Sequence, residues 1–198
     1  MANNNAPAGL VPIEYLSGAP WSGKARRYHI PSSDTNAYAI GDPVTLNGTA
    51  DANGVPGVVL ATPGSGMIGP IVSAGGLTYG GMSADPSNLN TTVIPATKTK
   101  DYYVLVADDP DIIFEVQEIG TGTALTAAEV SLNANLVAGT NSGYMSGWLL
   151  TNTTEAATAT LDVKLLGLRQ IPNNAFGAYA KWNVLICNHK YRGGATGV

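Results

Sequence analysis

Short apolar runs of strand length, separated by turn residues, recur along most of the chain. The stretches between them are rich in Gly, Pro, Asn and Asp, which favour turns. Strands are predicted at 26–30, 36–40, 43–47, 57–61, 69–74, 101–107, 111–118, 147–150, 159–169 and 180–190. Many short strands at this spacing predict an all-β protein, with an antiparallel sandwich, jelly-roll or barrel-like domain.

The predicted strand at 180–190 shows a clear alternation of apolar and polar residues. Trp182, Val184 and Ile186 share one face of this strand. Lys181 and Asn183 lie on the opposite face. Because the first face is wholly apolar, we expect it to pack into the core, with Trp182 as its largest residue.

Two local signals refine this pattern. The apolar positions change parity after Leu165, beside Gly167, as they do where a strand carries a β-bulge. Thr126 is followed three residues later by Glu129, which is the spacing of a capping box. This box predicts at most one short helix, ending near Asn133.

The N-terminal residues 1–26 show no sustained apolar period, either of strands or of helices. They contain Pro7, Pro12 and Pro20 and several glycines. We therefore expect an extended N-terminal arm that does not pack and is dispensable for folding. Residues 27–198 are then expected to form a single β domain.

The chain carries little charge for a soluble protein. Charged residues make up 12% of it, about half the usual fraction of roughly 25%. A free monomer usually exposes more charge than this. We therefore expect much of the surface to be covered, by further copies in a homo-oligomer (a dimer or trimer) or by another protein.

The charge balance also excludes some partners. The net charge is −4 and there are only ten Lys and Arg residues, whereas nucleic-acid binding requires clustered cations. No run of about 18 apolar residues could span a membrane. The N-terminal sequence lacks the basic and apolar regions of a secretory signal, so we expect synthesis in a cytosol. Cys187 is the one cysteine, which excludes an internal disulfide.

The segment 103–118 concentrates five carboxylates. They are Asp108, Asp109, Asp111, Glu115 and Glu118. A metal site, a pair of catalytic acids and a turn between two strands are the three interpretations. Asp followed by Pro is typical of a type I turn, and the ligand spacing of a calcium loop is missing. We favour a hairpin turn over metal binding, and metal binding over catalysis.

Other candidate motifs are better explained as structure than as chemistry. The segment 64–69 reads GSGMIG, but a strand-like segment follows where a dinucleotide fold needs a helix. Cys187 and His189 stand two apart on the last predicted strand, too far for a catalytic pair. Asp51 and Asn53 resemble half of a calcium loop and are better explained as a turn. We therefore expect no cofactor, no metal and no enzymatic activity.

Four segments together resemble the decoration or cement proteins of tailed-bacteriophage capsids. They are GLVPIEYLSGAPWSGKARRYHIPSSDTNAYAIGDPVTL (9–46), YVLVADDPDIIFEVQE (103–118), SLNANLVAG (131–139) and AKWNVLICNHKYRGG (180–194). The resemblance implies a virion structural protein made in the host bacterial cytoplasm. Such a protein binds the outer surface of the icosahedral capsid and clamps neighbouring copies of the major capsid protein.

In that role the end of the N-terminal arm should touch the capsid or another copy. The residue types enriched at interface hot spots there are Trp21, Lys24, Arg26, Arg27 and Tyr28. Two alternatives remain open. One is another virion part, such as a head–tail joining or tail protein. The other is a carbohydrate-binding β module for host attachment, with aromatic candidates Trp21, Tyr79, Tyr144 and Trp148.

Overall fold

The predicted all-β class is confirmed by the computed structural model, which describes residues 3–77 and 93–192. Within these ranges the one helical element is η1, a 3-10 turn at Ala127–Glu129. The strands are β1 (Val11–Tyr15), β2 (Arg26–Ile30), β3 (Tyr38–Ala39), β4 (Pro43–Ala50), β5 (Pro56–Leu60), β6 (Gly69–Leu77), β7 (Val93–Ile94), β8 (Tyr102–Val106), β9 (Ile112–Gln117), β10 (Asn133–Ala134), β11 (Leu136–Val137), β12 (Leu149–Leu150), β13 (Val163–Leu168) and β14 (Lys181–Ile186).

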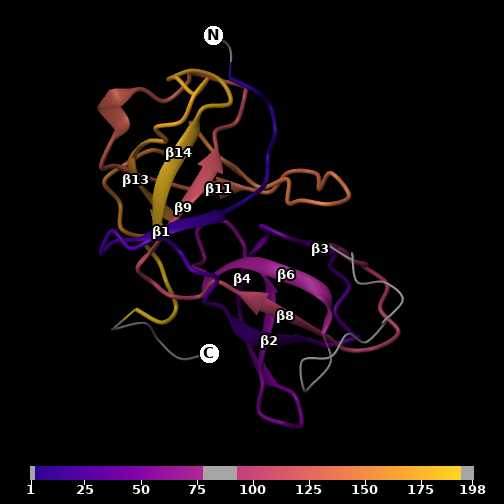
Figure 1. The fold of residues 1–198 in the computed structure, drawn as a ribbon. Coiled ribbons are helices and arrows are strands. Elements are labelled where there is room, and N and C mark those ends of the chain that lie inside the picture. The colour runs from indigo at the N-terminus through magenta and orange to yellow at the C-terminus, as the bar shows by residue number, and fades with distance from the viewer. Residues whose placement is uncertain (1–2, 78–92, 193–198) are drawn as a thin grey trace.

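The strands form two lobes, which lie one above the other in Figure 1. The sheet lobe is a five-stranded antiparallel sheet in the order β1-β9-β14-β13-β10. The barrel lobe is a closed barrel in the order β2-β5-β4-β6-β8. The chain starts in the sheet lobe with β1, builds the barrel with β2, β4, β5, β6 and β8, and returns to the sheet with β9. β3 and β7 pair with each other in a separate two-stranded sheet. The two lobes are therefore joined by more than one crossing of the chain.

Each lobe has its own cluster of buried apolar side chains. The cluster of the sheet lobe contains Trp182 and Phe114, which are 0% and 1% exposed. The cluster of the barrel lobe contains Tyr28, Ile71 and Val106. The apolar face predicted for the strand at 180–190 is confirmed, because all three of its residues are buried in the sheet lobe.

The predicted β-bulge and the predicted capping box are both present, but the predicted length of the helix is wrong. The predicted bulge is confirmed, since the register of β13 against β14 shifts beside Gly167. The capping box at Thr126 and Glu129 is also confirmed. The predicted extent of the helix is wrong, because it ends at Glu129 after a single turn. Asn133 already belongs to β10 and pairs with β13.

The acidic segment forms a turn, but the prediction of a hairpin is wrong. Ile112 donates its backbone N–H to the Asp109 carbonyl at 3.2 Å, which closes the turn. The flanking strands β8 and β9 do not pair: β8 lies in the barrel lobe and β9 in the sheet lobe. Each strand finds its partners in its own lobe, so this turn is a link between the lobes.

The prediction of an unpacked arm over residues 1–26 is wrong. β1 pairs with β9 along the edge of the sheet lobe, and Leu10 is 1% exposed within the core. Arg26 already belongs to β2. The sequence hid β1 because Pro12 and a shift in register beside it interrupt the alternation of side chains.

The chain after β1 folds back along the outer edge of this strand. Tyr15 donates its N–H to the Ala19 carbonyl at 2.9 Å, and Trp21 donates to the Ile13 carbonyl at 2.9 Å. Gly18 permits the tight turn by adopting a φ of 84°. The free edge of the sheet is thereby covered, which protects it from pairing with other chains.

Candidate interaction surface

Asp108, in the link between β8 and β9, is the polar centre of the junction between the lobes. Its side chain is nearly buried, and the Nε of Arg26 lies 2.7 Å from its Oδ2. The hydroxyl of Tyr28 donates a hydrogen bond to the same oxygen and lies 3.0 Å from the Tyr191 hydroxyl. Burial, and then the bond to Asp108, raises the pKa of Tyr28. This phenol therefore stays protonated and acts as a donor.

The side chain of Arg26 extends from the buried Asp108 carboxylate to the protein surface. Its side chain is 65% exposed, and its guanidinium carbon lies 5.1 Å from the centroid of the Tyr191 ring. An open cavity of about 440 Å³ lies beside it. This cavity is lined by Lys24, Ala25, Arg26, Asp108, Asp109 and Pro110. Cations and carboxylates face the same space, so it suits a polar partner better than an apolar one.

A second set of contacts extends this surface. Arg192 donates from Nη2 to the Asp111 carboxylate at 3.0 Å and to the Pro110 carbonyl at 2.8 Å. Leu16, whose side chain is exposed, donates its N–H to the Asp111 carbonyl at 2.8 Å. We call the combined surface the junction patch. It consists of Leu16, Lys24, Arg26, Asp109, Asp111, Tyr191 and Arg192.

The five predicted interface residues separate into three groups. Lys24 and Arg26 are exposed and lie in the junction patch. Trp21 is half-buried against the core of the sheet lobe, and its Nε1 donates to the Lys24 carbonyl at 3.1 Å. Arg27 is half-buried, one residue out of phase with Arg26 along β2. The prediction for Tyr28 is wrong, because it is 1% exposed and fills the barrel core.

Sequence reasoning missed the rest of the patch. Leu16 lies within the predicted arm, and Tyr191 and Arg192 follow the last predicted strand without any motif. They meet Arg26 and Asp111 only because the two lobes bring distant segments together. A Tyr–Arg pair after a buried strand was the one available signal, and it is weak by itself.

The remaining acids of the 103–118 segment have structural partners. Glu115 pairs with Lys181 at 2.8 Å and with Arg169 at 3.3 Å. Asp109 accepts the backbone N–H of Asp111 at 2.9 Å, which stabilises the turn. Among residues 3–77 and 93–192, no group of three or more His, Cys, Asp or Glu side chains is placed to hold a metal ion.

Glu118 is fully buried in the sheet lobe, and among residues 3–77 and 93–192 it forms no salt bridge with a cation. It accepts hydrogen bonds from the backbone N–H of Leu125 at 2.8 Å, from Asn152 Nδ2 at 3.2 Å and from Trp182 Nε1 at 3.0 Å. Burial raises the pKa of its carboxyl, although the three donors oppose that shift. These hydrogen bonds hold the 119–125 loop against the sheet lobe, which is a structural role rather than that of a catalytic acid.

Cys187 and His189 do not form a reactive pair. β14 ends at Ile186, so the two residues do not share a strand face. Burial raises the pKa of the Cys187 thiol and lowers that of the His189 imidazole. Both groups are therefore neutral near neutral pH, whereas nucleophilic catalysis needs a thiolate.

The two other motifs are turns, as predicted. Gly69 begins strand β6, so no helix follows the segment 64–69. Asp51 accepts the backbone N–H groups of Asn53 at 2.9 Å and Val55 at 2.8 Å. These bonds use the carboxylate to shape the β4–β5 loop.

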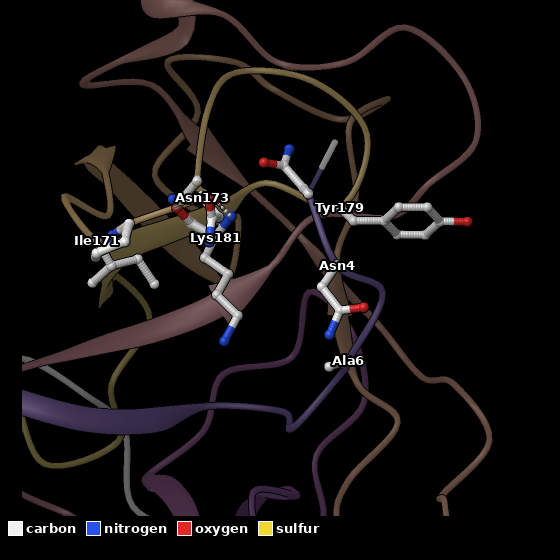
Figure 2. Close-up of a pocket in the computed structure, with 9 residues that line it drawn as sticks. Asn4, Ala6, Ile171, Asn173, Tyr179 and Lys181 are labelled. Carbon is white, nitrogen blue, oxygen red and sulfur yellow. Dashed lines mark hydrogen bonds between the residues drawn. The ribbon is translucent and has the colours of Figure 1, made fainter. Parts of the chain in front are cut away.

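A polar pocket of about 260 Å³ lies where the N-terminal segment meets the 170–181 loop (Figure 2). Asn3 donates to the carbonyls of Ala175 and Ala178 at 2.8 and 2.9 Å. Asn4 and Lys181 point into the pocket region, while the ring of Tyr179 points away from Lys181 (Figure 2). These hydrogen bonds hold Asn3 against the 170–181 loop.

The aromatic residues considered for carbohydrate binding do not form one surface. Trp148 is buried in the core of the sheet lobe, contrary to its expected exposure, and Trp21 is half-buried. Tyr144 is 72% exposed on a loop. Tyr79 lies outside the described residues. Of the described candidates, Tyr144 alone is exposed, so they do not form one shared stacking surface.

Comparison with models of known families, with curated proteins and with solved structures finds no match to this chain. In the part of the chain that the structure describes, no helix has the length and apolar character needed to cross a membrane.

Proposed function

We propose that this protein is a virion structural protein that decorates the outside of an icosahedral bacteriophage capsid. It bridges neighbouring major capsid subunits and has no enzymatic activity. The sequence resemblance over the four segments supports this role. The low fraction of charged residues is compatible with it.

One structural observation carries the proposal. Three of the segments that resemble cement proteins, 9–46, 103–118 and 180–194, meet at the junction patch. Arg26 comes from the first segment, Asp111 from the second and Arg192 from the third. Segments so distant along the chain converge here on a surface that includes exposed apolar, aromatic and charged groups. If the segments that resemble cement proteins serve one binding role, we expect them to meet on one surface.

The junction patch suits a protein partner rather than a nucleic acid. Its cations are balanced by Asp108, Asp109 and Asp111, so it does not present the unbroken positive charge that a phosphate backbone requires. Leu16 and Tyr191 add apolar area next to these charges. Apolar centres with a charged rim are typical of specific protein interfaces.

The proposal is tested by adding purified protein to capsid shells that lack it and measuring co-sedimentation. Lys24→Ala and Leu16→Ser should each weaken attachment by about 1–3 kcal/mol. Lys164→Ala is the matched control, because Lys164 is an exposed lysine on β13, outside the patch. If the wild-type protein does not bind shells, the cement role is wrong. Binding that is equally sensitive to all three substitutions would exclude the junction patch as the contact.

A further inference from the structure

The guanidinium of Arg26 is held in place by residues of its own chain. Its Nε lies 2.7 Å from Oδ2 of Asp108, and its Cζ lies 5.1 Å from the centroid of the Tyr191 ring. Tyr191 is itself fixed at two points. Its backbone N–H donates to Nδ1 of His189 at 3.1 Å, and its hydroxyl lies 3.0 Å from the hydroxyl of Tyr28. A long side chain that is already ordered loses less entropy when it binds a partner.

The outer part of the same guanidinium is open to solvent. The side chain of Arg26 is 65% exposed, whereas that of Asp108 is 6% exposed. Within residues 3–77 and 93–192, Nη1 and Nη2 of Arg26 donate no hydrogen bond. A guanidinium presents its N–H groups in a rigid planar arrangement that matches the two oxygens of a carboxylate. Arg26 therefore offers fixed, unused donors at the surface.

The second arginine of the junction patch is engaged differently. Nη2 of Arg192 donates to the Asp111 carboxylate at 3.0 Å and to the Pro110 carbonyl at 2.8 Å. Its side chain is 42% exposed. Arg192 therefore uses part of its donor set within the chain, while the Nη groups of Arg26 remain for a partner. The two arginines form a matched pair for mutagenesis.

Lys24 adds a second cation beside Arg26. Both residues line the open cavity of about 440 Å³. Lys24 is exposed, and its ammonium forms no ion pair within the part of the chain that the structure describes. The two acids that line this cavity already have partners, because Asp108 is paired with Arg26 and Asp109 accepts the backbone N–H of Asp111 at 2.9 Å. Two exposed cations are therefore available to an incoming anion.

A carboxylate of a protein partner is the anion that suits this arrangement. Its two oxygens match the paired donors of a guanidinium. Its single negative charge also suits a cavity whose two cations stand beside two acids, whereas a phosphate group adds up to two charges. We propose that Arg26 and Lys24 bind the carboxylate of an Asp or Glu side chain on the capsid subunit. This inference rests on the proposed function and names the chemical group that the partner contributes.

Co-sedimentation with capsid shells tests the role of the guanidinium. Arg26→Lys keeps the positive charge but removes the paired donors, so it should weaken attachment about tenfold or more. Arg192→Lys is the matched control and should weaken attachment less than about threefold, because its Nη2 is engaged within the chain. Circular dichroism verifies that both variants are folded. Equal attachment of the wild type and Arg26→Lys would overturn the inference and leave the cement role standing.

Carbodiimide cross-linking identifies the group on the partner. This reagent activates a carboxyl group, which then forms an amide bond with an amine in contact with it. On decorated shells, mass spectrometry should find Lys24 joined to an Asp or Glu residue of the major capsid protein. Lys24→Arg should remove this cross-link while keeping the charge. Lys164, an exposed lysine on β13, should give no such product. A capsid cross-link at Lys164 but not at Lys24 would overturn the inference.

Acetate tests the same site on the purified chain without a capsid. In a titration followed by nuclear magnetic resonance, the Nε–H signal of Arg26 should shift at least about threefold more than that of Arg192. A signal that responds to inorganic phosphate but not to acetate would overturn the assignment to a carboxylate. If Arg26 responds to acetate but the wild type does not bind shells, the carboxylate site stands and the capsid is the wrong partner.

Discussion

The hydroxyl of Tyr28, in the core of the barrel lobe, donates a hydrogen bond to the carboxylate of Asp108 in the link to the sheet lobe. Arg26 holds the same oxygen from the surface side. One carboxylate thus connects a core aromatic residue, an exposed cation and the chain crossing between lobes. The junction patch is therefore built on a fixed base, which lowers the entropy cost of binding a partner.

Asp108→Asn should destabilise the protein by about 1.5–3 kcal/mol, the range for hydrogen bonds that involve a charged group. The substitution removes the charge that Arg26 and Tyr28 share, while the size of the side chain is kept. Urea unfolding measures the effect. Asp109→Asn is the control, since Asp109 is half-exposed and should change stability by less than about 0.5 kcal/mol. Equal effects of both substitutions would contradict the role of Asp108.

Leu10→Ala should cost about 2–5 kcal/mol, as large-to-small changes in cores do. Leu10 is buried in the sheet lobe directly before β1. Truncation of residues 1–21 removes this side chain together with an edge strand, so the truncated chain should lose the cooperative unfolding of the sheet lobe. Circular dichroism melting of both variants tests this. A truncated chain with wild-type melting would restore the interpretation of this segment as a dispensable arm.

Lys98→Met should cost about 3–5 kcal/mol, because it leaves a partly buried carboxylate without its cation. The Lys98 side chain is 0% exposed. Its Nζ donates to the carbonyls of Asp34 and Asn36 at 2.8 and 2.6 Å, and lies 3.1 Å from the Asp34 carboxylate. Adding Asp34→Asn to Lys98→Met should recover part of the loss. Lys164→Met, on an exposed lysine, is the control for loss of charge.

Glu118 should give stability a pH dependence opposite to that of a salt-bridged acid. Burial raises the pKa of its carboxyl above the ordinary value of 4.5. The folded protein then binds the proton more tightly than the unfolded chain. This contribution to the free energy of unfolding is therefore present at low pH and is lost as pH rises through the folded pKa.

The comparison with Glu118→Gln isolates this contribution. The free energy of unfolding of the wild type minus that of the variant should decrease as pH rises above about 4.5 and through the folded pKa. Denaturant titrations across this range measure the difference. A difference that grows with pH would mean that the hydrogen bonds to Trp182 and Asn152 outweigh burial.

Strands with strong alternation could be predicted from the sequence, and others could not. The segment at 180–190 showed its buried face because each second residue is apolar. β1 was missed because Pro12 and a bulge break the alternation. β7, β10 and β11, three of the five two-residue strands, lie outside the predicted segments and are too short to show a period. For such segments the pairing partner, rather than the local sequence, decides the structure.

The junction patch could be predicted only in part for a similar reason. Lys24 and Arg26 are close in sequence, so the prediction of an interface includes both of them. The prediction of Tyr28 at the interface is wrong because an amphipathic aromatic residue suits a core and an interface equally well. Arg192 contacts Asp111 because the two lobes pack together, although 81 residues separate them in the sequence. Nothing local in the sequence encodes that proximity.

Cryo-electron microscopy of the intact virion tests the central proposal most directly. The account predicts density for this chain on the outer capsid surface at boundaries between major capsid subunits. Leu16, Lys24 and Arg26 should face a capsid subunit. Density only at the portal or tail, or a capsid-bound chain whose junction patch faces solvent, would contradict it.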